Sequence, residues 1–195
     1  MGTGERVILL DETGRAAGTA AKSEVHHRAT PLHLAFSCYV FGVGGELLVT
    51  RRASGKRTFP GVWTNSFCGH PEPGEPMADA VHRRARQELG IDLDGLRLVL
   101  PRFRYHAEQD GLVENEMCPV FLARGRVGDA APDPTEVDEV RRVDWASFSS
   151  AVRAGSWPGV SPWCADQVAA LHVLGAGPTA WPAADPAELP DAASW

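Results

Sequence analysis

Residues 69–91, GHPEPGEPMADAVHRRARQELGI, decide the fold of this chain. The first part is rich in Pro and Gly, which predicts a loop. From residue 77 on, apolar residues recur at every fourth position: Met77, Val81, Ala85 and Leu89. This spacing predicts a helix over residues 77–89, and Gly90 supplies its C-terminal stop. Arg84 and Glu88 are also four residues apart, so they share a second, polar stripe of the helix.

Strands are predicted on both sides of this helix. Alternation and turn residues favour a hairpin of residues 6–10 and 16–20, then a second hairpin of residues 32–41 and 46–50. On the strand 32–41, one face carries Leu34, Phe36, Cys38 and Val40, and the other carries His33, Ala35, Ser37 and Tyr39. Further strands are expected at residues 96–105, 114–123 and 140–145, and helices at 146–154 and 162–174. The fold class is therefore α/β (α+β) with a mixed sheet.

Length and composition indicate one compact domain. The chain has 195 residues with 44% hydrophobic and 23% charged residues, as in ordinary globular proteins. We expect a single domain over residues 1–174, and a disordered C-terminal tail over residues 175–195, which is rich in Ala and Pro and lacks Lys and Arg.

Charge and cysteine usage exclude several classes of protein. A formal net charge of -6 argues against nucleic acid as a partner, although Arg and Lys cluster at residues 51–57 and 83–86. The four cysteines permit two disulfides, but their dispersal without a C-x-x-C pair fits reduced thiols better. No signal peptide or membrane-spanning stretch is recognisable. We expect a cytoplasmic protein with no membrane partner, and a monomer.

Imidazoles, carboxylates and one thiol stand out as groups that bind metals or move protons. They are His26, His33, Cys68, His70, Glu88, Glu114 and Glu116. On a strand, side chains two residues apart point the same way, roughly 6.7 Å apart. Glu114, Glu116 and Cys118 therefore share one face of their run, and Cys68 and His70 share a face of theirs, so that each set can point into one pocket.

The stretch 69–91 resembles the Nudix box, G-x5-E-x7-R-E-U-x-E-E-x-G-U, where U is apolar. The matching positions are Gly69, Glu75, Arg83, Glu88, Gly90 and Ile91. Arg84 and Gln87 replace two glutamates of the pattern, which in Nudix hydrolases help to hold magnesium. The resemblance implies a Nudix-type α/β/α sandwich, with its core at about residues 31–165, and the two replacements disfavour hydrolysis of a nucleotide diphosphate.

Motifs outside the box resemble one branch of the superfamily, the type 1 isopentenyl-diphosphate delta-isomerases. They are Thr64-Asn65-Ser66-Phe67-Cys68-Gly69-His70-Pro71, Phe103-Arg104-Tyr105, Glu114-Asn115-Glu116 and Ser161-Pro162-Trp163. These motifs occur in the family's order, and the likeness runs from about residue 6 to residue 174. It implies an isomerase of isoprenoid biosynthesis that converts isopentenyl diphosphate to dimethylallyl diphosphate through a tertiary carbocation.

The resemblance also implies two metal ions. One Mn²⁺ or Zn²⁺ would be held by His26, His33, His70, Glu114 and Glu116, a nitrogen-rich set that suits such borderline ions. His27, next to His26, leaves the register of the first ligand open by one residue. A Mg²⁺ on the substrate would be held by Glu88 and the backbone carbonyl of Cys68, because magnesium prefers oxygen ligands.

Roles in catalysis follow from the same resemblance. Cys68 and Glu116 are the expected proton-transfer pair on opposite faces of the alkene, assisted by Tyr105. The aromatic face of Trp163 would stabilise the carbocation. The diphosphate would be bound by Lys22, Arg52, Lys56 and Arg84, with Arg84 favoured over Arg83 because it shares a stripe with Glu88.

Two other functions stay open on the sequence alone. One is a Nudix hydrolase of another diphosphate, against which the replaced box glutamates count. The other is a metal-stabilised protein that only binds isoprenoid diphosphates. The presence of Cys68, Tyr105 and Glu116 counts against it, since binding needs none of them.

Overall fold

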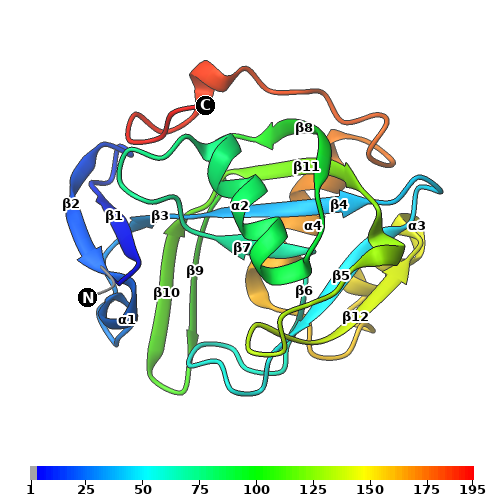
Figure 1. Ribbon diagram of the computed structural model, residues 1–195, viewed down its shortest axis with the longest axis horizontal. Helices are drawn as coiled ribbons and strands as arrows, with labels where there is room; N and C mark the ends of the chain where they lie inside the picture. Colours follow the sequence, from blue (N-terminus) through cyan, green and yellow to red (C-terminus); the bar gives the residue numbers. More distant parts are fainter. Residues whose placement is uncertain (1–3) are drawn as a thin grey trace.

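Two mixed β-sheets form the centre of the protein, in a computed structural model that describes residues 4–195 (Figure 1). The first three residues of the predicted 1–174 domain lie outside the described residues. The five-stranded sheet has the order β2-β1-β3-β10-β9. Its strands are β1 (Arg6–Leu10), β2 (Ala16–Ala21), β3 (His33–Leu34), β9 (Arg104–Gln109) and β10 (Leu112–Met117).

The second sheet has the order β12-β5-β4-β11-β8. Its strands are β4 (Phe36–Phe41), β5 (Leu47–Arg52), β8 (Leu93–Leu100), β11 (Val120–Gly125) and β12 (Val137–Val143). Two short strands extend it: β6 (Trp63–Thr64) pairs with β5, and β7 (Phe67–Gly69) pairs with β4. Both predicted hairpins, β1–β2 and β4–β5, are confirmed as antiparallel pairs.

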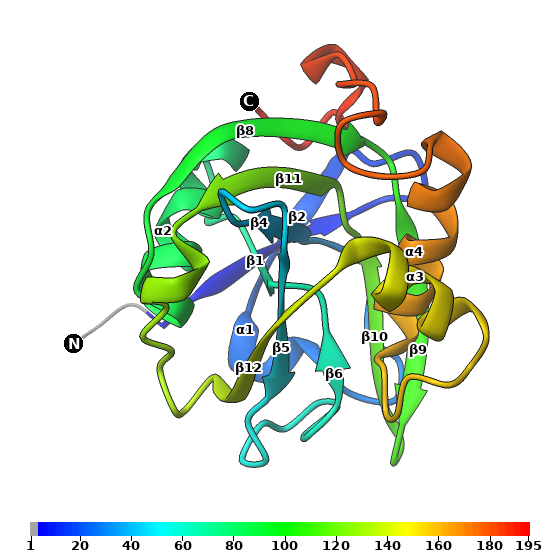
Figure 2. The same ribbon diagram turned by 90° about the vertical axis from the view of Figure 1, so that its right-hand side faces the viewer.

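The helices cover both faces of the second sheet (Figure 2). Helix α2 (Met77–Leu89) has the predicted bounds and ends at Gly90, whose φ of 66° is the left-handed conformation that glycine adopts most readily. Helices α3 (Trp145–Arg153) and α4 (Pro162–Leu174) lie on the opposite side, and α1 (Lys22–Val25) follows β2. Two 3-10 turns, Val127–Asp129 and Pro186–Glu188, complete the elements. Across residues 4–195, no helix combines the length and apolar character that a bilayer crossing needs.

The side chains of β4 alternate between these two layers as predicted. Phe36, Cys38 and Val40 pack in the core that includes Met77 and Val81 of α2. Ala35, just before β4, and Tyr39 and Phe41 within it belong instead to the core with α3 and α4. The predicted α/β (α+β) fold, a mixed sheet between helical layers, is thus confirmed.

Two adjacent chain segments both pass from the first sheet into the second. β3 continues into β4 through Ala35, and β10 continues into β11 through Cys118 and Pro119. The pairings β3–β10 and β4–β11 are both parallel. Between them, Ala35 N donates to Met117 O at 2.9 Å. The runs predicted as single strands at 32–41 and 114–123 therefore each bend between two sheets, and the bend sets His33 beside Glu116.

Two further predictions about the fold are wrong. The strand expected at 96–105 is two strands in different sheets, β8 and β9, because Pro101 has no N–H with which to continue the ladder. The tail expected to be disordered lies against the core along the top of Figure 1. Its Trp181 and Leu189 are buried, and Ser194 O accepts a hydrogen bond from Met77 N at the start of α2.

Candidate active site

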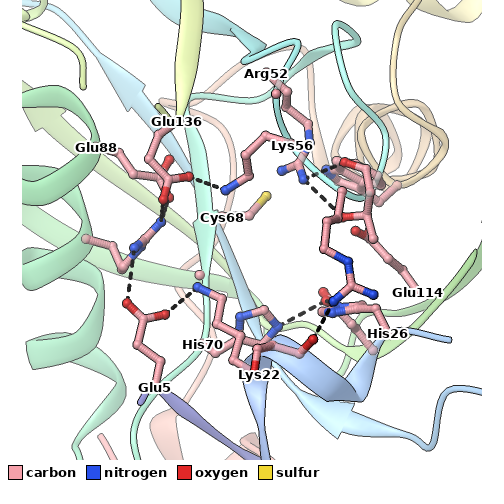
Figure 3. A pocket seen from close by; sticks show the side chains of 18 of the residues that line it. Glu5, Lys22, His26, Arg52, Lys56, Cys68, His70, Glu88, Glu114 and Glu136 are labelled. Atoms are coloured by element: carbon pink, nitrogen blue, oxygen red, sulfur yellow. Dashed lines mark hydrogen bonds and ion pairs between the residues drawn. The ribbon is translucent and has the colours of Figure 1, made fainter. Parts of the chain in front are cut away.

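One cavity of about 460 Å³ is lined by every predicted site residue except His33 (Figure 3). The twelve side chains come from separate parts of the chain, and the fold brings them together: Lys22, His26, Arg52, Lys56, Cys68, His70, Arg84, Glu88, Tyr105, Glu114, Glu116 and Trp163. His33 is fully buried behind the residues that line the cavity, and its ring contacts the Glu116 carboxylate. The predicted residues therefore form one site, with a histidine end and a basic end.

Three imidazoles converge on one carboxylate at the histidine end. The Nε2 atoms of His70, His33 and His26 lie 3.2, 3.4 and 3.9 Å from Oε1 of Glu116. One ligand atom from each of the four residues can be chosen so that all four atoms lie within 4.8 Å of one another. Parallel pairing of β3 with β10 puts His33 directly opposite Glu116. The four groups are thus close enough together to hold a single metal ion.

The ring nitrogens of this set fit a divalent ion. Nδ1 of His33 lies 3.0 Å from Pro31 O, and donating to that carbonyl leaves Nε2 with a free lone pair toward Glu116. The buried Nε2 atoms of His26 and His33 have no hydrogen-bond partner among the described residues, whereas buried polar atoms are normally paired. Burial lowers the pKa of His70 to about 4, so this imidazole is neutral, the form that binds metals.

Neighbouring residues limit the ligand set. Nδ1 of His27 accepts a hydrogen bond from Ala29 N at 3.1 Å within its own turn, and His26, not His27, belongs to the group of four. Glu114, the fifth predicted ligand, lies outside the group of four. Its carboxylate lines the same cavity and contacts Tyr105 instead.

Tyr105 bridges the two carboxylates of β10. Its hydroxyl lies 2.8 Å from Oε2 of Glu116 and 2.9 Å from Oε2 of Glu114. A hydroxyl has one hydrogen to donate, so the second short contact needs a proton on one carboxyl group. Burial and the charge of Glu116 raise the pKa of Glu114. Burial also acts to raise the pKa of Glu116, but the close contacts of its carboxylate with the His26, His33 and His70 imidazoles outweigh it and hold that pKa well below its usual range. The shared proton therefore belongs on Glu114.

Cys68 occupies the middle of β7, and its sulfur points into the cavity (Figure 3). Its Sγ lies 3.2 Å from Ser37 Oγ and 3.3 Å from Asn65 Oδ1. The amide nitrogen of Asn65 donates to Cys38 O and Phe67 O, which fixes the amide oxygen toward the thiol. Burial raises the pKa of Cys68 to about 12. In this environment the group is a thiol, able to give a proton.

Trp163 forms an aromatic wall at the start of α4. Its indole Nε1 donates to Thr64 Oγ1 at 2.9 Å, which fixes the ring. The ring centroid lies 5.5 Å from that of Tyr105 and 5.2 Å from that of Phe59. The Arg52 guanidinium lies 5.5 Å from the same centroid. The ring is therefore held where its face can meet a cation in the cavity.

The basic end of the cavity pairs each of three cations with a carboxylate. Lys22 Nζ lies 2.6 Å from Glu5, and Lys56 is ion-paired with Glu136 (Figure 3). Arg84 is ion-paired with Glu88. Burial raises the pKa of Glu88 more than the Arg84 charge lowers it. Arg52 donates to the carbonyls of Thr58 and Phe59.

The structure separates the two adjacent arginines of α2. Arg84 lines the cavity, whereas Arg83 donates through Nε and Nη2 to Glu75 at 2.7 Å and through Nη2 to the carbonyl of His70 at 3.1 Å. Arg83 thereby braces the loop between β7 and α2. Of the two arginines, Arg84 is the one whose side chain lines the cavity.

Several residues of the site were missed from the sequence. Glu5 and Glu136 line the cavity, and Ser37 and Asn65 support the thiol. Single carboxylates just before the first strand and in a Pro/Asp-rich loop carry no local signal. Asn65 lay inside a quoted motif, and Ser37 lay on a face predicted to oppose the apolar one. Only tertiary pairing of β4 with β7 reveals their part.

Comparison with known proteins places the chain in a family. The NUDIX domain family model matches residues 31–166. Among solved structures, a protein from Deinococcus radiodurans, DR0079, superposes with a TM-score of 0.63 over 85% of this chain and 98% of its own, at 19% identity. A MutT protein from Methanosarcina mazei Go1 gives a TM-score of 0.56, with 73% and 94% covered, at 18% identity. At this identity the likeness concerns the fold.

Curated relatives are much more similar in sequence. The isopentenyl-diphosphate Delta-isomerase of Saccharopolyspora erythraea is 56% identical over 190 residues, covering 97% of each chain. The enzyme of the same name from Rhizobium rhizogenes is 53% identical, with 97% of this chain and 90% of the relative covered. That from Frankia alni is 58% identical over 86% of each. The chain belongs to the Nudix superfamily and, within it, to the isopentenyl-diphosphate Delta-isomerase family.

Proposed function

We propose that this protein isomerises isopentenyl diphosphate to dimethylallyl diphosphate in the cytoplasm, as a monomer, by moving one proton onto and one proton off the substrate. The observation that carries this proposal is the convergence in one cavity of a protonated thiol, a Tyr–Glu pair and an indole face, next to a basic end. A hydrolase has no use for the first three groups together.

The reaction needs an acid and a base. A proton is added to the terminal alkene carbon, which leaves positive charge on the tertiary carbon, and a second proton is then removed from the carbon nearer the diphosphate. Cys68 and Glu116 are the exchanging groups. Tyr105 connects Glu116 to the proton held at Glu114. The Trp163 face stabilises the intermediate charge without forming a bond to it.

Two ions complete the proposed site. His26, His33, His70 and Glu116 would hold Mn²⁺ or Zn²⁺, with Glu114 adjacent, and such an ion would fix the orientation of the Glu116 carboxylate and lower its proton affinity. Glu88 and the carbonyl oxygen of Cys68 would hold the Mg²⁺ that neutralises the diphosphate. Lys22, Arg52, Lys56 and Arg84 would bind its oxygens directly.

The alternative, a Nudix hydrolase of another diphosphate, has less support. Two carboxylates of the box are absent, and Arg84, which replaces one of them, presents a cation to the cavity. A binding protein without activity would not need the buried hydrogen bonds that Asn65 and Ser37 make to Cys68.

One incubation tests the proposal. The protein, loaded with manganese and magnesium, is incubated with isopentenyl diphosphate in deuterated water, and products are analysed by mass spectrometry and a phosphate assay. We expect deuterated dimethylallyl diphosphate and no inorganic phosphate. Phosphate without isomer would establish the hydrolase instead. A Cys68→Ala variant should bind the substrate but turn it over at least about 100-fold more slowly, and near-normal turnover would remove the thiol from the mechanism.

A further inference from the structure

Three cations at the basic end of the cavity, Lys22, Lys56 and Arg84, form an open network of ion pairs with carboxylates of the protein itself. Besides their closest ion pairs, Arg84 lies 3.6 Å from Glu136 and 4.0 Å from Glu5. Arg84 thus connects the Lys22–Glu5 pair to the Lys56–Glu136 pair. A substrate phosphate must compete with these carboxylates for the same donors.

Glu136 is a carboxylate of this ion-pair network whose position is fixed by backbone hydrogen bonds. It lies just before β12, where its N–H donates to Asp133 O at 3.0 Å and its carbonyl accepts from Ala53 N at 2.9 Å. The second bond ties Glu136 to the turn that carries Arg52 and Lys56. With 22% of its side chain exposed, Glu136 is half-buried, and its carboxylate reaches both Lys56 and Arg84.

The charges within this ion-pair network cancel. Its three cations, Lys22, Lys56 and Arg84, are matched by three carboxylates, those of Glu5, Glu136 and Glu88. An alkyl diphosphate carries about two to three negative charges near neutral pH, since a terminal phosphate has a second pKa of about 6. A neutral network adds little net attraction for such an anion, which leaves Arg52, bonded to backbone carbonyls, as the cation whose charge no carboxylate of the network offsets. A divalent cation that binds together with the anion neutralises most of the anion's charge and so weakens its repulsion by the carboxylates.

We infer that Glu136 is a specificity-determining residue. Its charge keeps the ion-pair network neutral, so that the site selects diphosphate bound to a divalent cation over the free anion. On this view Glu136 is not a ligand of the magnesium ion. Glu136 competes with the diphosphate for Lys56 and Arg84. The diphosphate displaces Glu136 from these cations only when a metal ion offsets the repulsion between Glu136 and the anion. The inference rests on the proposed function, because it takes the basic end as the diphosphate site.

Equilibrium binding of inorganic diphosphate, which has no alkene to isomerise, tests the inference directly. Calorimetric titration would compare the wild-type protein, its His-site metal retained, with a Glu136→Gln variant, in magnesium-free buffer and in millimolar magnesium. We expect the variant to bind magnesium-free diphosphate about tenfold more tightly than wild type, because one opposing charge is removed. With magnesium, the two affinities should agree within about threefold, and the magnesium-free gain should shrink at high salt.

Glu139→Gln is the matched control. Glu139 also lies in β12 but pairs with Arg51 and Arg141, and it does not line the cavity, so it should bind like wild type. Glu5→Gln removes another carboxylate of the network and should give the same gain in affinity for magnesium-free diphosphate. This second variant keeps the test decisive if Glu136→Gln does not fold.

Two results would overturn the inference alone: unchanged magnesium-free affinity in both variants, or a loss of affinity with magnesium in Glu136→Gln, which would make Glu136 a metal ligand. Failure of wild type to bind diphosphate with magnesium would instead overturn the diphosphate site, and the proposed function with it.

Discussion

Tyr105 and Glu116 face each other across the paired strands β9 and β10, and the Tyr105 hydroxyl lies 2.8 Å from the Glu116 carboxylate. The same hydroxyl lies 2.9 Å from Glu114, so one phenol connects the carboxylate at the centre of the histidine cluster with a second carboxyl group, whose pKa is raised by burial and by the charge of Glu116. This chain of short contacts gives Glu116 a route for exchanging a proton although it is almost fully buried.

Replacing Tyr105 by Phe tests this connection. The variant keeps the ring that contacts Trp163 but removes the shared hydroxyl. We expect kcat for isomerisation to fall about 10- to 100-fold, with KM within about threefold of wild type, because proton exchange is impaired while the diphosphate contacts remain. The readout is the initial rate of deuterium incorporation. Tyr39→Phe removes the other tyrosine hydroxyl, which bonds to Gln167 away from the cavity, and should change kcat by less than about threefold. Equal effects in the two variants would contradict the proposed role.

His26 and His27 form a matched pair for testing the metal site. Nε2 of His26 lies 3.9 Å from Glu116, whereas the His27 ring accepts a hydrogen bond from Ala29 N through Nδ1. We expect His26→Gln to lower the metal bound per chain, measured by elemental analysis after dialysis against zinc or manganese, and to reduce the gain in thermal stability that the metal gives. His27→Gln should keep both. The reverse pattern would move the ligand to residue 27.

Much of this site was accessible from the sequence because its signals are local. The helix 77–89 and its polar stripe follow from spacing within one element, and Arg84 and Glu88 accordingly lie at the cavity. The E-x-E run places Glu114 and Glu116 on one face of a strand, and Tyr105 meets both. Period and motif therefore predicted which side chains point the same way.

What the sequence could not show depends on contacts between distant segments. The bend that carries β10 into β11 puts Cys118 beside Ser37, away from the two glutamates with which it was expected to share a face. Glu136 reaches Lys56 only because Ala53 pairs with it across the chain. The ordered tail was missed because its Ala/Pro composition resembles a disordered segment, while its order depends on a few anchors, such as Trp181, that bury against the rest of the protein.

The ionisation of Cys68 gives a prediction about pH. Burial raises the pKa of this thiol to about 12, so its neutral form is favoured, and the thiolate fraction should rise about tenfold per pH unit throughout pH 7–10. The rate of alkylation by iodoacetamide, followed by peptide mass spectrometry on protein freed of divalent ions, should rise with the same slope. A plateau with a midpoint near the ordinary thiol value of about 8.5 would contradict it. Cys38, Cys118 and Cys164 are buried and should react far more slowly.

The C-terminal segment should contribute to stability through Trp181. Its ring lies 4.8 Å, centroid to centroid, from that of Trp145, near-perpendicular to it, and its indole N–H donates to Gly175 O at 3.2 Å. Arg97 donates to the carbonyls of Pro178 and Trp181. We expect Trp181→Ala to lower the free energy of unfolding by about 3 to 5 kcal/mol, because a large buried ring is lost and a cavity remains.

Trp195→Ala is the control for this prediction, because 45% of that residue is exposed although its ring lies against Phe121. It should cost far less than Trp181→Ala in urea-induced unfolding followed by circular dichroism. If the segment were a disordered tail, neither substitution would move the unfolding midpoint. A large loss confined to Trp181→Ala would instead show that residues 175–195 are held against the core in solution, since only an ordered segment can lose a packed indole.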